Sequence, residues 1–234
     1  RMKKYRLRRW LYIKFGFDVY PEIPVYKKYL RTAPVNFNET KNWHLPDCNQ
    51  PEIQARLIDK IPFLDQDSSV IIIFPGARHY TKRWPWSRYK QLINKILKNT
   101  DCKIILAGDR DDFNLLAGED FSNNNIINTC GQYNLIETIC LVSLSEIVIS
   151  NDSGPMHIGA LFHKPQIAIF GNTVSKFGFG PLNDLAVIIE EDGLDCRPCS
   201  HIGYNKCPKG HFKCMRDISP EKVYKEFTNL IDSV

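Results

Sequence analysis

From about residue 70 onward, short runs of apolar β-branched residues alternate with amphipathic segments long enough for helices. The first run, Val70-Ile71-Ile72-Ile73-Phe74, is apolar without alternation, which is typical of a strand covered on both faces. Between Trp86 and Lys98, apolar residues recur at helical spacing, which predicts an amphipathic helix. We therefore expect parallel strands joined by crossover helices.

The alternation continues to the end of the chain. It predicts further strands at 103–107, 126–129, 146–150, 165–170 and 186–190, and helices at 111–117, 135–144 and 154–162. Ser219 as N-cap and Pro220 at the first helical position indicate a final helix. The predicted fold class is α/β, with a doubly wound parallel sheet.

The chain before this pattern has a different texture. Prolines break residues 1–65 into short pieces, in which we expect one or two basic helices, around 3–15 and 24–31. We predict two parts: a basic, proline-interrupted leader at 1–65 and a sheet domain at 66–234. The second part includes a cysteine-rich loop at 196–214 and the C-terminal helix.

Composition places the 234-residue chain among ordinary soluble globular proteins, with 43% hydrophobic and 24% charged residues. No apolar run reaches the roughly 18 residues that a membrane span needs. The net charge of +5 is uneven: residues 1–31 carry +8 and the rest carries −3. The leader lacks the apolar centre of a signal peptide, so we expect a cytoplasmic protein. The opening Arg1-Met2 indicates either an added residue or a start inside a longer protein.

The loop from Pro75 to Pro85 directly follows the first predicted strand, where ligands of such sheets bind. Its small residues let a ligand approach the backbone, and Arg78, Lys82 and Arg83 supply cations that suit a phosphate or diphosphate. The Walker A pattern is absent. The alternative is a solvated loop that only packs against the sheet.

A second unusual turn, residues 150–157, joins a buried strand to a helix. Ser153 or Asp152 can cap this helix, and its free first-turn amides would attract an anion. Asp152 can also accept hydrogen bonds from sugar hydroxyls, and His157 lies one turn into the helix. Ordinary capping and a core histidine are the alternative interpretation. In the next turn, Asn172 and Thr173 offer further donors.

The eight cysteines fall into two sets. Four are scattered singly through segments predicted to be structural: Cys48, Cys102, Cys130 and Cys140. The other four lie together in the loop: Cys196, Cys199, Cys207 and Cys214. Four thiolates suit tetrahedral zinc, but the wide spacing of the second pair favours a structural role without metal, as free thiols or one disulfide.

Two blocks of this sequence match a known family. The first is P-G-A-x(4)-K-R-W-P, starting at Pro75, and the second is S-N-D-S-G-P-M-H-I-G-A-L-F-H-K-P-Q-I-A-I-F-G-N-T at 150–173. With the C-terminal cysteine pattern, they resemble the bacterial heptosyltransferases of glycosyltransferase family nine over residues 70–234. The resemblance implies a GT-B glycosyltransferase, built from two facing Rossmann-like domains, of which this chain is the C-terminal half.

The resemblance also implies a site and its substrates. The donor would be a nucleotide-diphosphate sugar, ADP-heptose in typical members, and the acceptor a lipopolysaccharide core. Lys82 matches the donor-phosphate lysine and Asp152 the acidic residue that holds the sugar hydroxyls. The remaining matches are Ala77 and Arg78 at the diphosphate, Ser153, Gly154 and Pro155 at the leaving group, His157 at the family's histidine, and Asp112 and Tyr133 near the ribose and base. Many members carry Thr or Ser where this chain has Arg78.

Such residues would support an inverting displacement in which Lys82 and helix amides stabilise the departing diphosphate without a required metal or other cofactor. In the family, the catalytic base lies in the acceptor domain, so we expect this chain alone to transfer sugar poorly or not at all. The alternative is a nucleotide-sugar binding module, or a truncated paralogue, without transferase activity.

The basic leader suits two further interpretations. In the first, its basic and aromatic residues rest on the anionic inner leaflet of the cytoplasmic membrane. In the second, they form a solvated basic helix. A nucleic-acid partner is not expected, because the remainder of the chain is net acidic and carries no recognisable nucleic-acid module.

Overall fold

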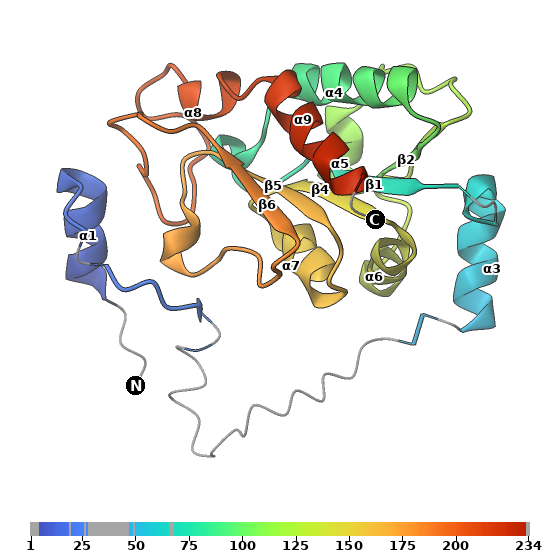
Figure 1. The fold of residues 1–234 in the computed structure, drawn as a ribbon, viewed down its shortest axis with the longest axis horizontal. Helices are drawn as coiled ribbons and strands as arrows, with labels where there is room; N and C mark the ends of the chain where they lie inside the picture. The colour runs from blue at the N-terminus through green and yellow to red at the C-terminus, as the bar shows by residue number, and fades with distance from the viewer. Residues whose placement is uncertain are drawn as a thin grey trace, which may run out of the picture.

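The computed structural model describes residues 5–18, 20–25, 27, 47–48, 50–65 and 68–232. Its centre is one parallel sheet of six strands in the order β3-β2-β1-β4-β5-β6 (Figure 1). The strands are β1 (Val70–Phe74), β2 (Lys103–Leu106), β3 (Ile126–Asn128), β4 (Ile147–Asn151), β5 (Gln166–Phe170) and β6 (Ala186–Glu190). This order doubles back between β1 and β4, so the predicted doubly wound sheet is confirmed.

Helices cover both faces of the sheet, with α4 and α9 above it and α6 and α7 below it in Figure 1. The longer helices are α1 (Arg6–Phe15), α3 (Pro51–Lys60), α4 (Trp86–Asn99), α6 (Leu135–Leu144), α7 (Gly154–Leu161) and α9 (Pro220–Ile231); α5 (Arg110–Leu115) and α8 (Lys213–Arg216) are short. Single 3₁₀ turns lie at Pro62–Asp65, Tyr80–Lys82 and Ser175–Phe177. Every sheet-domain element predicted from the sequence is present, with bounds shifted by one or two residues.

The residues of β1 show why both faces must be covered. All five are buried, and they alternate between two hydrophobic clusters. Ile71 and Ile73 pack in the cluster that contains the apolar residues of α4 and α9, whereas Ile72 packs in the cluster of α3 and α6. A strand with two dry faces needs apolar residues at every position, which explains the unbroken run in the sequence.

The final helix begins where the sequence predicted. Ser219 is the N-cap of α9, and its Oγ accepts a hydrogen bond of 3.1 Å from the backbone N–H of Lys222. Pro220 occupies the first turn, and Val223 and Phe227 are fully buried against the sheet. Cap, proline and apolar stripe together direct α9 onto the same face as α4.

Helix α3 is an element that sequence reasoning missed. Residues up to 65 were expected to be irregular apart from basic helices, because their prolines break the pattern. Pro51 instead stands in the first turn of α3, where its missing N–H costs nothing. Leu57 is fully buried against the sheet, and Arg56 Nε lies 3.0 Å from the carboxylate of Glu137 on α6. The predicted division at residue 65 therefore falls just after a helix that packs on the sheet.

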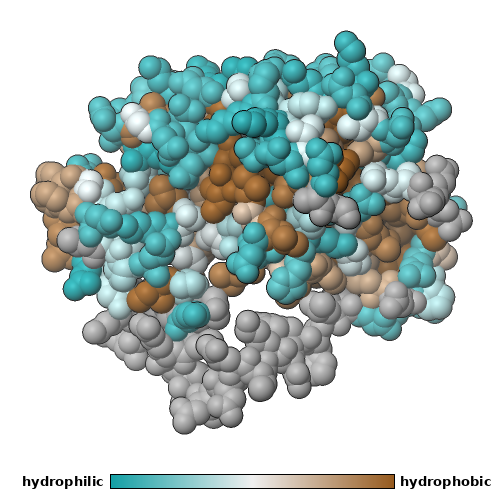
Figure 2. Space-filling view, viewed as in Figure 1, coloured by the Kyte–Doolittle hydropathy of each residue, from teal (hydrophilic) through white to brown (hydrophobic). Residues whose placement is uncertain are grey.

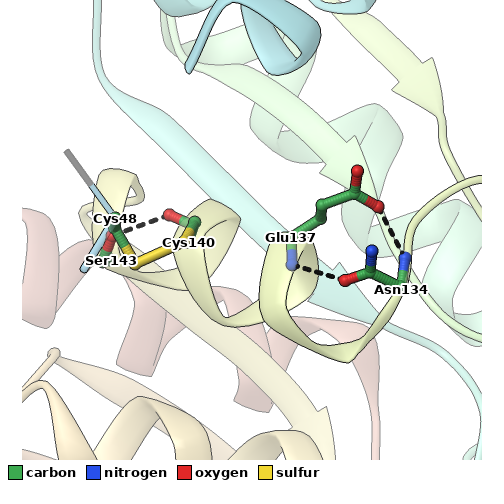
Figure 3. The surroundings of a disulfide bond; sticks show 5 residues. All are labelled: Cys48, Asn134, Glu137, Cys140 and Ser143. Carbon is green, nitrogen blue, oxygen red and sulfur yellow. Dashed lines mark hydrogen bonds between the residues drawn. A yellow bond between two sulfur atoms is a disulfide. The ribbon is translucent and has the colours of Figure 1, made fainter. Parts of the chain in front are cut away.

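A disulfide joins Cys48, which precedes α3, to Cys140 in α6 (Figure 3). From the sequence both were expected to be single structural cysteines, and that expectation is wrong for this pair. Their separation of 92 residues hides the pairing, since only the packing of α3 on α6 brings them together. The start of α6 is fixed by a capping box in which Asn134 and Glu137 each bind the other's backbone N–H (Figure 3).

The first predicted leader helix is confirmed as α1, which starts at Arg6. The ring of Tyr12 packs edge-on against Phe177 at 5.9 Å, so α1 lies beside the turn that follows β5. The second, at 24–31, falls mainly outside the described residues. In the ranges that the structure describes, no helix is long and apolar enough to cross a membrane.

Candidate functional site

A cavity of about 720 Å³ opens beyond the carboxyl ends of β1, β2 and β4, where the strand order reverses. This is the place at which doubly wound sheets bind ligands. Of the site residues predicted from the sequence, those that line it are Ala77, Arg78, Asp112, Tyr133, Ser153, Gly154 and Pro155. Lys82, Asp152 and His157 are not part of this lining and form a group beside it.

Glycines make room for a carboxylate at the floor of the cavity. A Cβ on Gly76 would lie 1.6 Å from Oδ1 of Asp112, and one on Gly108 would lie 2.3 Å from its Oδ2. Asp112 is held there as the third residue of α5, where its carboxylate accepts the backbone N–H of Asp109 at 3.1 Å. Burial raises the pKa of Asp112, an effect that the nearby Arg83 opposes.

Arg83 is a cavity residue to which the resemblance gave no role. Its Nε donates a hydrogen bond of 2.6 Å to the carbonyl of Ala77, which fixes the guanidinium along the loop after β1. The exposed Arg78 lies on the same loop. Two guanidinium groups therefore line the cavity, and such groups bind phosphate oxygens.

The N-terminus of α7 points its backbone amides into the cavity. Ser153 is the N-cap, but its hydroxyl donates to the carbonyl of Asn151 at 3.3 Å and caps no amide of the helix. Pro155 has no N–H, and within the described residues no other side chain caps this helix. The positive end of α7 is thus available to an anion, as the sequence predicted.

Lys82, Asp152 and Thr173 form a nearly dry polar cluster next to the cavity. Nζ of Lys82 lies 2.7 Å from Oδ2 of Asp152, and the hydroxyl of Thr173 donates to the same oxygen at 2.5 Å. The side chains of Lys82 and Asp152 are only 16% and 4% exposed, so water screens their pairing weakly. The turn after β1 and the turn after β4 thereby meet at one charged contact.

His157 lies within electrostatic reach of this cluster. Desolvation by the surrounding protein lowers the pKa of its imidazole, as does Lys82, and Asp152 acts in the opposite direction. His157 therefore lies near enough to Asp152 and Lys82 to be affected by their charges, although the residue is exposed to solvent.

Asn151, the last residue of β4, connects the two turns more extensively than any predicted residue. Its fully buried side chain donates to the carbonyls of Pro75 and Gly76 at 2.9 and 3.0 Å and accepts the backbone N–H of Trp84 at 3.0 Å. Nothing in the sequence predicts this role of Asn151, because its amide binds loops that only the folded structure brings next to it.

The cysteine-rich loop supports Lys82 from the other side. The backbone N–H and hydroxyl of Thr81 both donate to the carbonyl of Tyr204 at 3.1 Å, and the N–H of Tyr204 donates back to the hydroxyl at 2.8 Å. Arg197, buried in the same loop, donates to the carbonyls of Gly171 and Thr173 at 2.6 and 3.0 Å and pairs with Glu190. Arg197 thus holds the turn after β5, which carries Thr173, the hydroxyl partner of Asp152.

The clustered cysteines lie near one another. Burial raises the pKa of Cys199, and it raises that of Cys214 to about 12, with the other thiols of the cluster adding to both shifts. Cys196 Sγ lies 3.7 Å from Nε2 of His211. Across the described ranges, no three or more His, Cys, Asp or Glu side chains are placed to hold a metal ion. Zinc at Cys196, Cys199, Cys207 and Cys214 stays the less favoured of the two interpretations, and metal analysis of the purified protein can test it.

Tyr133 forms one wall of the cavity, on the side of α3. Nζ of Lys60 lies 5.7 Å from the centroid of its ring. Its hydroxyl is buried and has no hydrogen-bond partner among the described residues. Burial, with Glu137 nearby, raises the pKa of Tyr133 to about 12, so the group is a neutral phenol at pH 7. A flat ring at this wall is suited to stack on a nucleobase.

The sheet order and the position of the cavity define a Rossmann-like domain of the kind that binds nucleotides at its switch point. The sequence model of glycosyltransferase family 9 (heptosyltransferase) matches residues 28–208. The chain belongs to this family.

Curated relatives agree with this assignment. The chain is 29% identical over 201 residues to lipooligosaccharide heptosyltransferase 2 of Campylobacter jejuni, which covers 78% of this chain and 60% of that protein. It is 28% identical to the protein of the same name from Haemophilus influenzae, covering 96% of this chain and 62% of the relative. The chain therefore spans about 60% of the length of these relatives.

Solved structures show the same fold. ADP-heptose lipopolysaccharide heptosyltransferase II of Escherichia coli superposes with a TM-score of 0.62 at 23% identity, and a family 9 glycosyltransferase of Veillonella parvula with 0.65 at 21%. Each match covers 78% of this chain and 52% of the other. The predicted Rossmann-like fold of a GT-B heptosyltransferase is confirmed, and the assignment to its C-terminal half stays a prediction.

Proposed function

We propose that this chain is the donor-binding part of a heptosyltransferase and that it binds a nucleotide-diphosphate sugar in the cavity at the switch point. The observation that carries the proposal is the convergence of the free α7 N-terminus with Arg78 and Arg83 in one cavity of a family 9 chain. A diphosphate would meet helix amides and guanidinium groups there, and Tyr133 would face the base. ADP-heptose is the donor that the family resemblance favours.

In the proposed reaction, an acceptor hydroxyl attacks the anomeric carbon, the carbon–oxygen bond to the diphosphate breaks, and the acceptor proton passes to a base. Negative charge grows on the departing diphosphate, where Lys82 and the amides of α7 would stabilise it. Asp152 would accept hydrogen bonds from the sugar hydroxyls while Thr173 and Lys82 keep its carboxylate in place. These groups carry the charge without a metal, so EDTA is expected to leave nucleotide binding unchanged.

Calorimetric titration of ADP, UDP, GDP and an ADP-sugar tests the donor proposal. We expect ADP and the ADP-sugar to bind and Lys82→Ala to weaken both at least tenfold. Lys90→Ala is the matched control, because Lys90 also pairs with a carboxylate, that of Glu119, but its side chain is exposed on α4 and does not line the cavity. Equal affinity of the Lys82→Ala and Lys90→Ala variants would remove Lys82 from the site, and absence of any nucleotide binding would overturn the donor proposal.

Turnover by the chain alone is a separate question. We expect no transfer from ADP-heptose to a deep-core lipopolysaccharide acceptor, because the family's catalytic base belongs to the acceptor domain. Normal turnover by this polypeptide would show that the base lies within it. A binding module without transferase activity is the competing function, and acceptor transfer after addition of a separately expressed acceptor domain distinguishes the two.

We also propose that α1 contacts the anionic inner leaflet of the cytoplasmic membrane. In and just after this helix, exposed apolar side chains lie close in sequence to basic ones: Leu7, Trp10, Phe15 and Phe17 with Arg6, Arg8, Arg9 and Lys14. Figure 2 shows apolar colour on the end of the molecule where α1 lies. Co-sedimentation with vesicles containing phosphatidylglycerol should capture the protein, and vesicles of phosphatidylcholine alone should not. Equal capture by both would contradict an electrostatic contact.

A further inference from the structure

A second cavity, of about 640 Å³, lies beside the donor cavity and shares Arg83 with it. It is formed by the loop after β1, the first turn of α4 and the short helix α8. Neither the family resemblance nor the proposed donor site uses it. Three arginines line its wall: Arg83, Arg88 and Arg216.

These three positive charges are not neutralised within the described part of the chain. No carboxylate lines the cavity, and none lies within 4.0 Å of a guanidinium nitrogen of the three. Asp112 and Glu221 influence Arg83 and Arg88 only from a greater distance. By contrast, Arg56 and Arg197 elsewhere each pair directly with a glutamate. Like charges gathered around one hollow favour an anion.

Two of the arginines are nevertheless held in place by carbonyl groups. Arg83 Nε donates to the carbonyl of Ala77 at 2.6 Å, and Arg88 Nη2 donates to that of Arg216 at 3.0 Å. These bonds orient the guanidinium planes and leave other N–H groups of each free to bind a ligand. The N-cap of α4 is Pro85, which offers no side-chain cap, so the first-turn amides add positive potential to the same wall.

Aromatic rings form another part of the cavity wall. The rings of Tyr80 and Phe212 stack with centroids 4.9 Å apart, and Trp86 forms part of the same lining. Flat rings bind the apolar C–H faces of sugar rings, whereas guanidinium groups bind phosphate oxygens in pairs. A ligand that satisfies both walls carries a saccharide ring and a phosphate.

We propose that this second cavity binds a phosphate-bearing saccharide, with the phosphate at Arg88 and Arg216 and the sugar ring against Tyr80 and Trp86. The ligand is either a free sugar phosphate or a phosphorylated residue of the acceptor glycan; only the latter source rests on the proposed function. In that case the shared Arg83 places the acceptor's anion next to the donor.

The test is calorimetric titration of glucose 6-phosphate, glucose and inorganic phosphate into the full chain. Glucose 6-phosphate is expected to bind more tightly than inorganic phosphate, and glucose not at all. In Arg88→Gln/Arg216→Gln the affinity for glucose 6-phosphate should fall at least tenfold, and in Lys98→Gln, at the far end of α4, less than twofold. No binding to the wild type, or equal binding to both variants, overturns the proposal.

Two further arms separate the possible failures. ADP titration should be unchanged in Arg88→Gln/Arg216→Gln, because neither residue lines the donor cavity. If neither the wild type nor any variant binds ADP, the donor proposal alone is overturned. If only the double variant fails to bind ADP, the assignment of a separate cavity is overturned. Competition of glucose 6-phosphate by a phosphorylated core oligosaccharide, but not by its phosphatase-treated form, supports the acceptor as the source. Failure of both to compete assigns the cavity to a free sugar phosphate.

Discussion

The amide of Asn151 is expected to hold the candidate site together, and its removal should lower the stability of the whole sheet domain. The side chain is 0% exposed and makes its three hydrogen bonds with backbone groups that are themselves buried, on Pro75, Gly76 and Trp84. Asn151→Ala leaves all three without a partner. A buried polar group that loses its partner costs about 1–3 kcal/mol, so the expected loss is at least about 3 kcal/mol.

This loss is a large part of the roughly 5–15 kcal/mol that stabilise a domain. With a urea slope of about 2–3 kcal/mol/M, it moves the unfolding midpoint down by about 1–1.5 M. Intrinsic tryptophan fluorescence follows the transition, since Trp84 is buried directly beside Asn151. ADP affinity should fall in parallel, because the turn after β1 is no longer held to the turn after β4.

Two further variants sharpen the experiment. Asn151→Asp keeps the shape and the acceptor for Trp84 but places a carboxylate oxygen against the two carbonyls, so it should destabilise at least as much as Asn151→Ala at pH 7. Asn99→Ala removes an exposed amide whose Nδ2 donates to Lys95 at 2.7 Å, and it should change stability by less than about 0.5 kcal/mol. A loss below about 1 kcal/mol in Asn151→Ala would refute the reasoning.

Three other outcomes are expected. Arg197→Met should lower the free energy of unfolding in urea by about 2–4 kcal/mol, because Glu190 and the carbonyls of Gly171 and Thr173 lose their partner. A free energy of unfolding within about 0.5 kcal/mol of wild type would contradict the role of Arg197 in holding the turn after β5. Cys48→Ser should lower the free energy of unfolding by about 2–4 kcal/mol, and dithiothreitol should destabilise the wild type but not this variant; a wild type insensitive to reduction would exclude the disulfide as a stabilising link. The pKa of Asp112 is raised in the folded state, so the folded protein binds this proton more readily than the unfolded chain does. The free energy of unfolding of the wild type, relative to that of Asp112→Asn, should therefore rise as the pH is lowered from 7 to 4, as measured by urea midpoints. A difference that stays constant with pH would show that burial does not perturb this carboxyl.

The candidate site was predictable where neighbouring residues of one short segment form a local feature. The turn at 150–157 is an example: Ser153, Gly154 and Pro155 lie together in sequence, and the structure places them at the start of α7 in the wall of the cavity. Lys82 and Asp152 were assigned through the family resemblance, and the structure brings them to 2.7 Å of each other. Arg83 was predicted only as one of the cations of the loop after the first strand. Asn151 and Arg197 received no role, because their partners lie in other loops and nothing in the local pattern indicates them.

The sequence by itself determined the alternation of strands and helices, the doubly wound class of the sheet and the residues of the two unusual turns. Local periodicity and capping are properties of neighbouring residues, so the chain displays them without folding. Tertiary structure decided the contacts between distant segments: the Cys48–Cys140 link, the packing of α3 on α6, the three bonds of Asn151 and the cavity ringed by Arg83, Arg88 and Arg216. These contacts depend on which surfaces meet when apolar faces are buried. The local sequence around one side chain does not determine which distant residue will contact it.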